Sequence, residues 1–530
     1  MGLALFDLRY TEVWVALLIV VLGSPVVYAA QTLLIKCLRV RRARYMFETQ
    51  GFKCLPRPFF TGNLPEFVAI NKKTRSEPMP DIVHAVAPRV LPHLYKWSQT
   101  YGEHFIYWFG FQPRYIIQDP ELGKELLVTK SGHFKKPSGR PDTKDLIGMG
   151  LVSLDGEKWA QHRRIINPAF FVDKLKAMAP TMGDLTVELM RKWEPLVKEK
   201  EAINVAAEFQ NLTADIIAHT AFGSSFAEGK VVFDLQHEQQ LLIAKLSSRI
   251  YIPGSQFFPT RENWHRKSID KRIRKVLGKI IGKRMELGKA TRGDAYGNDL
   301  LGLMLAANQG VINGNARGLS MGLDELIDEC KTFFFAGHDT TATLLTFMFL
   351  LLATHREWQE RLREEVFEVC GNKHIPTADS LNNMKLVSMV IYEALRLYPP
   401  AIALLRETDT DMKLGNKLIP AGTAIIVPII AWHQDERFWG ADAKEFNPER
   451  LAEGITKACK VPGAYLPFSL GPRNCIGQVF ATIEAKVVLA TILQRYRFRI
   501  SSQYVHSPTV VLTLKPEFGM PIVFEEILSA

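Results

Sequence analysis

The residues best suited to chemistry in this chain surround one cysteine, Cys475, in the stretch FSLGPRNCIG. Cys475 comes just before an apolar pattern with helical spacing, so its sulfur would face backbone N–H groups at a helix N-terminus, which favour a thiolate. Gly471 and Gly477 would let the backbone approach something large and flat. Phe468 would shield the sulfur from water, and Arg473 would offer a fixed positive fork to a carboxylate.

A thiolate in this setting is a candidate metal ligand. Zinc requires three or four clustered ligands, and no second cysteine or histidine lies near Cys475 at ligand spacing. A single axial thiolate suits haem iron instead. The alternative is a buried free cysteine in a glycine-rich turn, although F-x-x-G-x-R-x-C-x-G is expected by chance only on the order of 10⁻⁴ times in a chain of this length.

The stretch resembles the haem-binding loop of the cytochrome P-450 superfamily, the haem-thiolate monooxygenases. Four further motifs of that family occur in the expected order: W-x-x-x-R in EKWAQHRR, the long-helix motif in AGHDTT, E-x-x-R in YEALRLYPP and P-E-R in FNPERL. Taken singly, W-x-x-x-R and E-x-x-R also fit ordinary helix surfaces. Taken together, the motifs leave negligible room for chance, and the resemblance covers roughly residue 55 to the C-terminus.

The resemblance implies a role for each residue that matches a motif. Asp339 and Thr340 of AGHDTT would deliver protons during oxygen activation. Glu393 and Arg396 would join Arg450 in a buried charge cluster that holds the core around the thiolate loop. The residues implied to bind the cofactor are Cys475, as the metal ligand, with Phe468, Gly471, Arg473, Gly477, Trp159, Arg163 and Arg406.

The implied reaction inserts one oxygen atom of O₂ into a C–H bond of a hydrophobic small molecule. The implied cofactor is haem b, iron protoporphyrin IX, with an axial cysteine thiolate that favours O–O cleavage. The chain has no G-x-G-x-x-G and no P-loop glycine run, so NADPH would act only through a partner, an NADPH–cytochrome reductase of the flavoprotein type. The basic surplus of the chain fits an acidic partner.

The substrate class follows only from the resemblance. NDLLGLML and DECKTFFFAGHDTTA are similar to a plant clan that contains cytokinin, gibberellin and brassinosteroid hydroxylases, fatty-acid in-chain hydroxylases and triterpenoid oxidases. DGEKWAQHRRIINPAF favours the fatty-acid branch, and a hydroxylase of a plant hormone or terpenoid is the alternative. The candidate pocket residues, all apolar, are Phe335, Ala336, Ile402, Leu404 and Val511.

Two functions of other classes remain open. One is a reductase-independent isomerase or dehydratase of peroxides on the same fold. Such members often lack the acid–threonine pair that this chain has. The other is a non-enzymatic haem or membrane-interaction protein, which would keep the thiolate site but bind no apolar substrate.

The N-terminal region predicts a membrane anchor. Residues 13–35 carry no charge and are long enough to span a bilayer as a helix. Bases crowd behind this span, so the positive-inside rule leaves residues 1–12 non-cytosolic and turns the catalytic domain to the cytosol. A cleaved signal peptide is the alternative, but it requires a basic start and a shorter apolar core. We therefore expect a single-pass protein of the endoplasmic reticulum membrane, in contact with lipid.

Composition bounds the rest. The chain has 530 residues, a net charge of +11 and six scattered cysteines, too few for a disulfide scaffold. The sequence contains no compact basic block interleaved with aromatic residues, so it does not favour a nucleic-acid-binding protein. Helical patterns outnumber the strand patterns AIIVPII, RYRFRI and TVVLTL. We predict a mainly α fold with a minor β part (α+β): a basic cluster and proline-rich hinge at 36–66, then one monooxygenase domain at 67–530.

Overall fold

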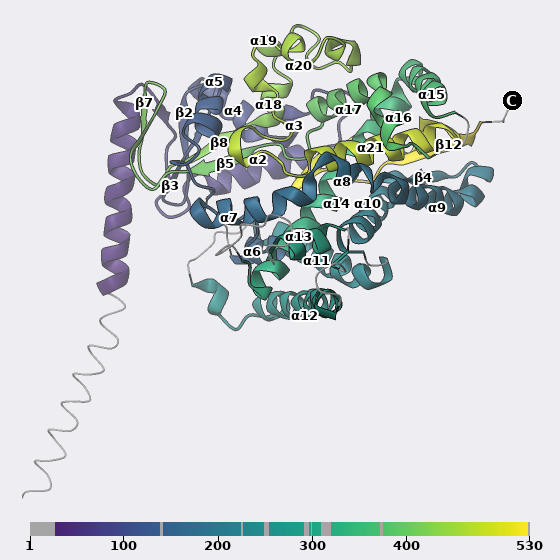
Figure 1. Ribbon diagram of the computed structural model, residues 1–530. Coiled ribbons are helices and arrows are strands. Elements are labelled where there is room, and N and C mark those ends of the chain that lie inside the picture. Colours follow the sequence, from purple (N-terminus) through teal and green to yellow (C-terminus); the bar gives the residue numbers. More distant parts are fainter. Residues whose placement is uncertain are drawn as a thin grey trace, which may run out of the picture.

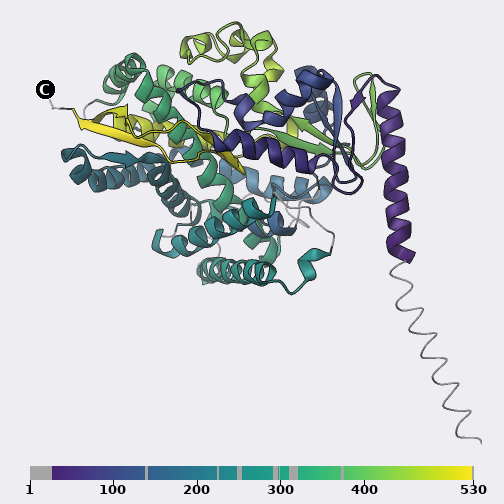
Figure 2. The same ribbon diagram turned by 180° about the vertical axis from the view of Figure 1, so that it is seen from behind.

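The computed structural model describes residues 27–137, 141–223, 226–247, 254–290, 296–297, 299–308, 320–371 and 375–527. The predicted segment 1–12 and the first part of the predicted anchor, up to residue 26, lie outside this part of the chain. Residues 27–48 form one helix, purple in Figures 1 and 2, that stands away from the body of the protein. Its last turns are fastened to that body by the buried side chains of Ala43 and Phe47, and the ammonium group of Lys36 lies 5.8 Å from the ring centre of Phe111.

Helices make up most of the described chain, which confirms the predicted balance of helix and sheet. The longer ones are α2 (Leu64–Ser76), α4 (Pro92–Tyr101), α7 (Gly156–Ile166), α9 (Ala179–Lys198), α10 (Val205–Phe222), α11 (Phe226–Ser247), α12 (Arg261–Ala290), α14 (Leu323–Thr354), α15 (Arg356–Cys370), α17 (Lys385–Leu397) and α21 (Gln478–Leu493). The shorter ones are α3 (Ala87–Val90), α5 (Pro120–Lys124), α6 (Pro141–Ile147), α8 (Val172–Lys176), α13 (Leu300–Asn308), α16 (Ala378–Asn383), α18 (Ile429–His433), α19 (Glu436–Trp439) and α20 (Ile455–Ala458). A π-helix, η1 (Glu125–Thr129), and the 3₁₀ turns η2 (Asn167–Phe170), η3 (Ser255–Phe257), η4 (Pro448–Leu451), η5 (Pro462–Ala464) and η6 (Gly471–Arg473) complete the helical elements.

The strands form small sheets at the two ends of the helical body (Figure 1). The largest sheet has the order β1 (Lys53–Cys54), β2 (Phe105–Phe109), β3 (Gln112–Ile116), β8 (Ala424–Val427), β5 (Leu404–Glu407). A second sheet has the order β4 (Ala202–Asn204), β12 (Pro521–Glu526), β9 (Tyr496–Ile500). The hairpins are β6 (Met412–Leu414) with β7 (Lys417–Ile419), and β10 (Pro508–Val511) with β11 (Thr513–Pro516).

Two of the predicted strands are broken where the backbone requires it. The run at 424–430 ends as a strand at Val427, because Pro428 cannot donate to a sheet ladder, and α18 follows at Ile429. The run at 509–514 folds back on itself as the hairpin β10–β11, with Leu512 in the left-handed region at φ +66°. The third run, at 495–500, forms β9 as predicted.

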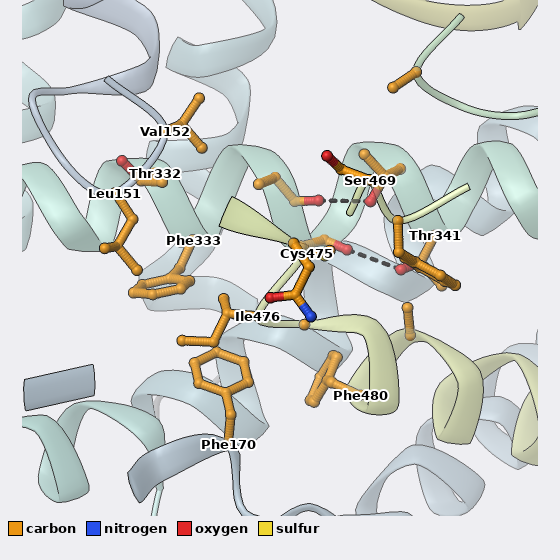
Figure 3. A pocket seen from close by; sticks show the side chains of 18 of the residues that line it. Leu151, Val152, Phe170, Thr332, Phe333, Thr341, Ser469, Cys475, Ile476 and Phe480 are labelled. Carbon is orange, nitrogen blue, oxygen red and sulfur yellow. Dashed lines mark hydrogen bonds between the residues drawn. The ribbon is translucent and has the colours of Figure 1, made fainter. Parts of the chain in front are cut away.

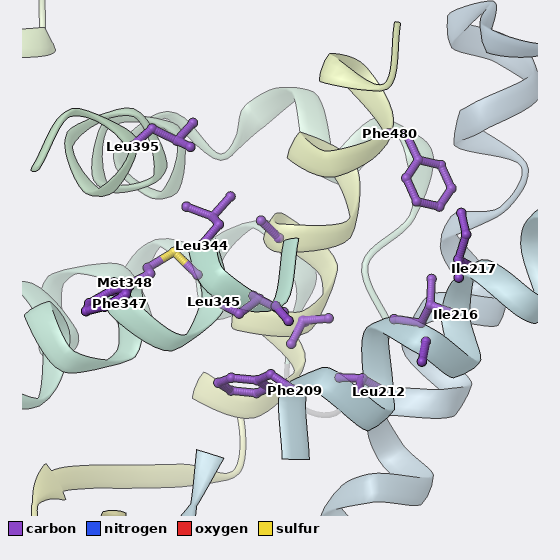
Figure 4. Close-up of a cluster of buried hydrophobic side chains, with 14 of the residues drawn as sticks. Phe209, Leu212, Ile216, Ile217, Leu344, Leu345, Phe347, Met348, Leu395 and Phe480 are labelled. Carbon is purple, nitrogen blue, oxygen red and sulfur yellow. The ribbon is translucent and has the colours of Figure 1, made fainter. Parts of the chain in front are cut away.

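Helix α14 crosses the centre of the protein and supports the site. The described residues hold one helix long and apolar enough to span a bilayer, this one, and 78% of its most apolar window is buried by the rest of the protein. It is therefore a core helix. Figure 4 shows how α10 packs along it, with Phe209 and Leu212 facing Leu345. Each such buried side chain contributes roughly 1.5–3 kcal/mol to folding.

The proline-rich segment predicted as a hinge is instead part of the body. Its start pairs with the sheet through β1, and the Asn63 side chain accepts from the backbone N–H of Trp108 at 2.9 Å. Asn63 also donates to the carbonyl of Pro56 at 2.8 Å, and Pro65 lies in the first turn of α2, where proline is tolerated. The prolines thus fold the chain against the sheet rather than leaving a free linker.

Candidate functional site

A cavity of about 360 Å³ lies between α14, α21 and the loop that carries Cys475 (Figure 3). The residues of α14 that line it share one face of the helix, because they recur at intervals of three and four. They are Thr332, Phe333, Ala336, Gly337, Thr340, Thr341 and Leu344. Phe468, Ile476, Gly477 and Phe480 line the opposite side, and Trp159 and Arg163 contribute from α7.

The Cys475 loop is rigid because its own backbone bonds close it. The N–H of Cys475 donates to the carbonyl of Phe468 at 2.9 Å, and the N–H of Asn474 donates to Gly471 at 3.1 Å. The thiol of Cys475 is exposed to the cavity. Helix α21 begins at Gln478, slightly later than the sequence predicted, so the thiol lies just before its first turn.

The two predicted glycines have different roles. Gly477 lines the cavity, and a Cβ there would meet nothing closer than the Cys475 sulfur at 3.9 Å, so the backbone is open to a large flat group as predicted. Gly471 is not among the lining residues. It has φ +73°, and a Cβ would lie 2.4 Å from the carbonyl oxygen of Leu127 in η1. Gly471 therefore seats the loop on η1, and its predicted contact with a cofactor stays a prediction.

Electrostatics around the thiol act in opposite directions. Burial raises the pKa of the Cys475 thiol, while a hydrogen bond from the Gly477 N–H and the nearby Arg163 charge lower it. Arg163 donates to the carbonyl and side-chain oxygens of Asn474, both at 3.1 Å. A cation bound at the sulfur would act in the same direction as the Gly477 N–H and Arg163 and lower the pKa of the thiol further, since the metal ligand is the thiolate.

Cations gather at one side of the cavity with few counter-charges. Arg473 pairs with Asp155 and lies 4.6 Å over the ring of Trp159. Lys136 donates to the carbonyl of Val152 at 2.8 Å, and burial together with Arg473 lowers the pKa of Lys136 to about 7.

Arg406 lies beside this group without lining the cavity. The hydrogen bond that its guanidinium makes is to the backbone carbonyl of Leu405, at 2.8 Å. The side chain is 5% exposed, and burial with the Arg473 charge lowers the pKa of Arg406 to about 10. Among the residues that the structure describes, Asp155 is the carboxylate whose charge raises the pKa of both Arg406 and Arg473.

These residues fit haem. Four side-chain cations, Lys136, Arg163, Arg406 and Arg473, stand near one carboxylate, so the site has positive charge to spare for two carboxylates of a ligand. The open backbone at Gly477 and the aromatic rings of Phe468 and Phe480 suit a flat macrocycle beside the thiol. Haem supplies both propionates and an iron that takes an axial thiolate.

Thr340 and Asp339 point in different directions. The Thr340 hydroxyl lies at the cavity and donates to the carbonyl of Ala336 at 2.7 Å. The Asp339 side chain is fully buried away from the cavity, where it pairs with Lys515 and accepts from Thr513. Burial alone would raise the pKa of Asp339, but Lys515 and Thr513 hold it below its ordinary value. Of the two residues predicted to deliver protons, Thr340 therefore lines the cavity and Asp339 does not.

The predicted charge cluster is present. Arg396 makes two bonds to the carboxylate of Glu393, at 2.7 and 2.8 Å, and Arg450 reaches the same carboxylate at 3.1 Å. Sequence reasoning missed a second carboxylate, Asp442, which pairs with Arg450 at 2.8 Å. Because every buried charge has a partner, the cluster avoids the desolvation penalty of an unpaired ion.

Two of the predicted pocket residues line the cavity and three do not. Ala336 and Leu404 line it. Phe335 packs against Leu146 and Ile243 in a separate buried cluster, because it lies on another face of α14 from Ala336. Ile402 packs on the main core, and Val511 ends β10 beside the hairpin turn. Phe335, Ile402 and Val511 thus lie outside the lining of this cavity.

Several lining residues were not predicted to line a pocket. They are Lys136, Phe170, Ile217 and Leu300. Phe170 and Leu300 lie in stretches that resemble the plant clan, but nothing in those stretches marks them as cavity residues. The ring of Phe170 lies 5.6 Å from that of Phe333, and together they close one wall (Figure 3). Only the fold brings these segments together.

Comparison with known proteins agrees with this geometry. The family model for cytochrome P450 matches residues 85–520. Cytochrome P450 734A6 of Oryza sativa subsp. japonica is 42% identical over 496 residues, 92% of this chain and 92% of its own length. Cytochrome P450 CYP72A616 of Paris polyphylla is 44% identical over 492 residues, 92% of this chain and 94% of its own. Cytochrome P450 709B1 of Arabidopsis thaliana is 41% identical over 488 residues, 91% and 92% of the two chains. Members of this family are monooxygenases that use O₂ and haem held by a cysteine thiolate.

Proposed function

Because the chain belongs to the cytochrome P450 family, we propose that it is a membrane-anchored monooxygenase that hydroxylates C–H bonds of a hydrophobic small molecule. The observation that carries the proposal is one cavity where the Cys475 thiol, a cluster of cations and the Thr340 hydroxyl meet. Bound haem supplies the activation of dioxygen at an iron ligated by Cys475. Arg163, Arg473 and Lys136, which line the cavity, would hold its propionates together with Arg406 beside them.

The chain's own residues position the substrate and move protons. The apolar side chains of Phe170, Phe333 and Leu404 hold an apolar substrate and exclude water. The Thr340 hydroxyl holds a proton at the cavity wall. Asp339 stays ionised on the far side of α14, where Lys515 fixes its carboxylate. Asp339 therefore acts on the cavity only through a change of its rotamer or through Thr340.

The substrate remains a matter of class. The printed names of the relatives state no substrate, and the cavity lining supports any sufficiently apolar molecule. Fatty acids hydroxylated in-chain and plant hormones or terpenoids are therefore tested side by side. The electron source that we propose is an NADPH-dependent flavoprotein reductase, consistent with the net charge of +11.

Residues 13–35 are proposed to anchor the protein in the endoplasmic reticulum membrane, with the catalytic domain in the cytosol. The length and charge pattern of this span support the proposal. The exposed apolar side chains of Leu34, Ile35 and Leu38 on the described part of the helix also support it.

The deciding measurement is the absorption spectrum of the reduced, carbon-monoxide-bound protein. We expect the strongly red-shifted Soret band of thiolate-ligated haem, and we expect its loss in Cys475→Ala with the circular dichroism of the fold retained. A haem-replete, active Cys475→Ala protein would contradict the proposal. Reconstitution with reductase and NADPH then screens fatty acids, steroids and terpenoids. Turnover of peroxides without NADPH would favour an isomerase or dehydratase instead.

A further inference from the structure

Glu329 is a buried carboxyl group of α14 that joins two other segments to this helix. Its side chain and the ring of His162, on α7, are both fully buried. The Nδ1 atom of His162 lies 2.6 Å from Oε1 of Glu329, within hydrogen-bond distance. The N–H of Leu151 donates to Oε2 of the same carboxyl group at 3.1 Å. One acid therefore fastens both α7 and the loop around Leu151 to the central helix.

The loop approaches this carboxyl group closely because residue 150 is a glycine. A Cβ at Gly150 would lie 2.6 Å from Oε2 of Glu329 and would also collide with the hydroxyl of Thr332. The Thr332 hydroxyl itself donates to the carbonyl of Ile147 at 2.7 Å, so α14 holds the chain before the glycine as well as after it. A shift of the carboxyl group would therefore shift the loop that packs on it.

The two partners of the carboxyl group oppose the effect of its burial. Burial raises the pKa of Glu329, while the hydrogen bonds from His162 and from the Leu151 N–H lower it. The other ring nitrogen of His162, Nε2, has no hydrogen-bond partner within the described residues and lies 4.0 Å from Oε2 of Glu325. The ring is thus held through Nδ1, by Glu329.

Both segments that Glu329 fastens carry cations of the site. Arg163 directly follows His162 on α7 and lines the cavity. Val152, the next residue of the loop, lines the cavity too, and its carbonyl accepts from the ammonium group of Lys136 at 2.8 Å. The carboxyl group itself is not part of the lining, so it acts on the cavity through these neighbours.

Two further links join α7 to the start of α14, and both are at the surface. Lys158 pairs with Glu325 at 2.6 Å, and these side chains are 57% and 30% exposed. The Gln161 amide donates to the carbonyl of Ser320 at 3.1 Å. Exposed pairs contribute little, whereas a buried polar group that loses its partner is costly. The buried bond is therefore the one that fixes α7 against the central helix.

We propose that Glu329 is a positioning residue for the propionates of haem. It acts on Arg163 through His162, and on Lys136 through the loop that it fastens. The inference rests on the proposed binding of the propionates by the cations of the site. It adds that one buried acid behind the cavity wall keeps these cations in place. Haem should therefore leave faster when that acid is lost, although every cation and the Cys475 loop remain.

The first test changes which nitrogen remains at position 162. His162→Asn places its amide nitrogen near the position of Nδ1 and keeps the bond to Glu329, whereas His162→Gln places it near Nε2 and loses that bond. We expect haem to pass to a haem-accepting protein about tenfold faster from His162→Gln than from wild type. His162→Asn should release haem at close to the wild-type rate. Equal rates for wild type and His162→Gln, or an equal rise in both variants, would overturn the proposal.

The second test locates the change within bound haem. In resonance Raman spectra of the ferric protein, we expect the propionate bending modes to shift in His162→Gln and in Glu329→Gln, which loses one of its two acceptor oxygens. The iron–sulfur stretch should keep its wild-type frequency, because the Cys475 loop is closed by its own backbone bonds. Propionate modes that do not move, or an iron–sulfur stretch that moves as well, would contradict a role in positioning.

The third test needs no haem. Glu329→Met removes both acceptors, so in the haem-free protein the amide of Leu151 should exchange its hydrogen faster than in wild type. The amide of Cys475, which donates to the Phe468 carbonyl, should exchange at the wild-type rate. An unchanged Leu151 rate would count against the inference. If Glu329→Met does not fold, Glu329→Gln and the variants at His162 still decide the question.

The matched control is Lys158→Met, which removes an exposed link between α7 and α14 and leaves the buried bond intact. It should change neither haem transfer nor the Raman spectrum. If Arg163→Leu and Lys136→Met do not hasten haem transfer, the proposed binding of the propionates fails, and this inference fails with it. If they hasten it and the variants at Glu329 and His162 do not, this inference alone fails.

Discussion

At the scale of residues, Lys136 should affect the stability of the haem-free protein and the binding of haem in opposite directions. Its ammonium group donates to one backbone carbonyl, and its pKa is lowered to about 7 by burial and by Arg473 and Arg406. A side chain so disfavoured as a cation opposes folding of the protein without haem. The same charge attracts a propionate once haem binds, so the two states should respond to its removal in opposite ways.

Lys136→Met should therefore stabilise the haem-free protein and weaken haem binding. We expect the free energy of unfolding of the haem-free form to rise by on the order of 1–2 kcal/mol at neutral pH, a figure reduced for partial exposure. Haem should leave the variant faster in transfer to a haem-accepting protein. Urea unfolding and haem-transfer rates measure the two effects, and a loss of stability in the haem-free form would contradict the argument.

The pH dependence of that stability follows from the sign of the shift. The folded-state pKa of Lys136 lies below its ordinary value near ~10.4, so between about pH 7 and pH 10 the unfolded chain binds more protons than the folded one. Lys136 therefore makes the haem-free protein more stable as pH rises through this window. In Lys136→Met the rise should be smaller.

Thr340→Ala should raise peroxide release, because the Thr340 hydroxyl lies at the cavity and Thr340 is one of the two residues that the motif implies in proton delivery. We expect about a tenfold rise in peroxide per NADPH, below the ~10²–10⁴ of a sole general acid. The matched control is Thr346→Val, whose hydroxyl makes the same kind of bond to the Ala342 carbonyl but is buried away from the cavity. Equal coupling in Thr340→Ala and wild type would remove Thr340 from proton delivery.

At the scale of elements, the hairpin β10–β11 is fastened to α14. Lys515 and Thr513 hold Asp339, and the Thr343 hydroxyl donates to the carbonyl of Leu514 at 3.1 Å. The hairpin thus fixes the rotamer of an acid that lies in the middle of the central helix. Its two strands come from a single apolar run that the sequence predicted as one strand.

Lys515→Met should destabilise the protein by about 3 kcal/mol, since it leaves a buried carboxylate without its cation. The pKa of Asp339 is lowered in the folded state, so the stabilisation is present above its ordinary value near ~3.9 and is lost as pH falls through the folded-state value. The difference between wild type and variant should accordingly shrink in acid. Urea unfolding at neutral pH and near pH 3 checks this, and a difference that does not depend on pH would contradict it.

The seat of the Cys475 loop on η1 gives a paired comparison of two glycines. Gly471→Ala should cost about 1–3 kcal/mol, because φ is +73° and the new Cβ would collide with the Leu127 carbonyl. The shifted loop should reduce the fraction of protein with the thiolate–haem spectrum. Gly477→Ala, with open space around its Cβ, should leave the haem-free fold intact and affect only haem binding. Equal destabilisation by both would contradict this assignment.

At the scale of the whole molecule, the sequence predicted which positions along the chain belong to the site. It did not predict the directions in which their side chains point. Motifs identified Cys475, Thr340 and the Glu393 cluster because family patterns name positions along the chain. They could not tell that Asp339, one residue from Thr340 and therefore rotated by about 100° on the helix, faces away from the cavity. Phe335, a predicted pocket residue next to Ala336, packs away from the cavity for the same reason. Lys136 and Phe170 escaped notice because only tertiary contacts bring them to the cavity.

The helix at residues 27–48 leads to a prediction for the intact protein. It stands apart from the body, and only Ala43 and Phe47 near its end are well buried (Figure 2). Removal of residues 1–35 should therefore leave the fold and the thiolate–haem spectrum unchanged. The truncated protein should be in the soluble fraction after the membranes are washed with salt. Continued membrane binding would indicate a second contact, for which the basic run 266–289 in α12 is the candidate.

Strand β4 can pair with β12 only after the C-terminal end of the chain has been synthesised. Ile522 pairs with Ile203, and the hairpin that fastens Asp339 comes just before β12. At translation rates of about 5–20 residues per second, roughly 15–60 seconds separate the synthesis of the two strands. In that interval α10, and later α14, are synthesised before the C-terminal segments that cover their apolar faces. The finished core, and with it the site for haem, can therefore form only late in synthesis or after it.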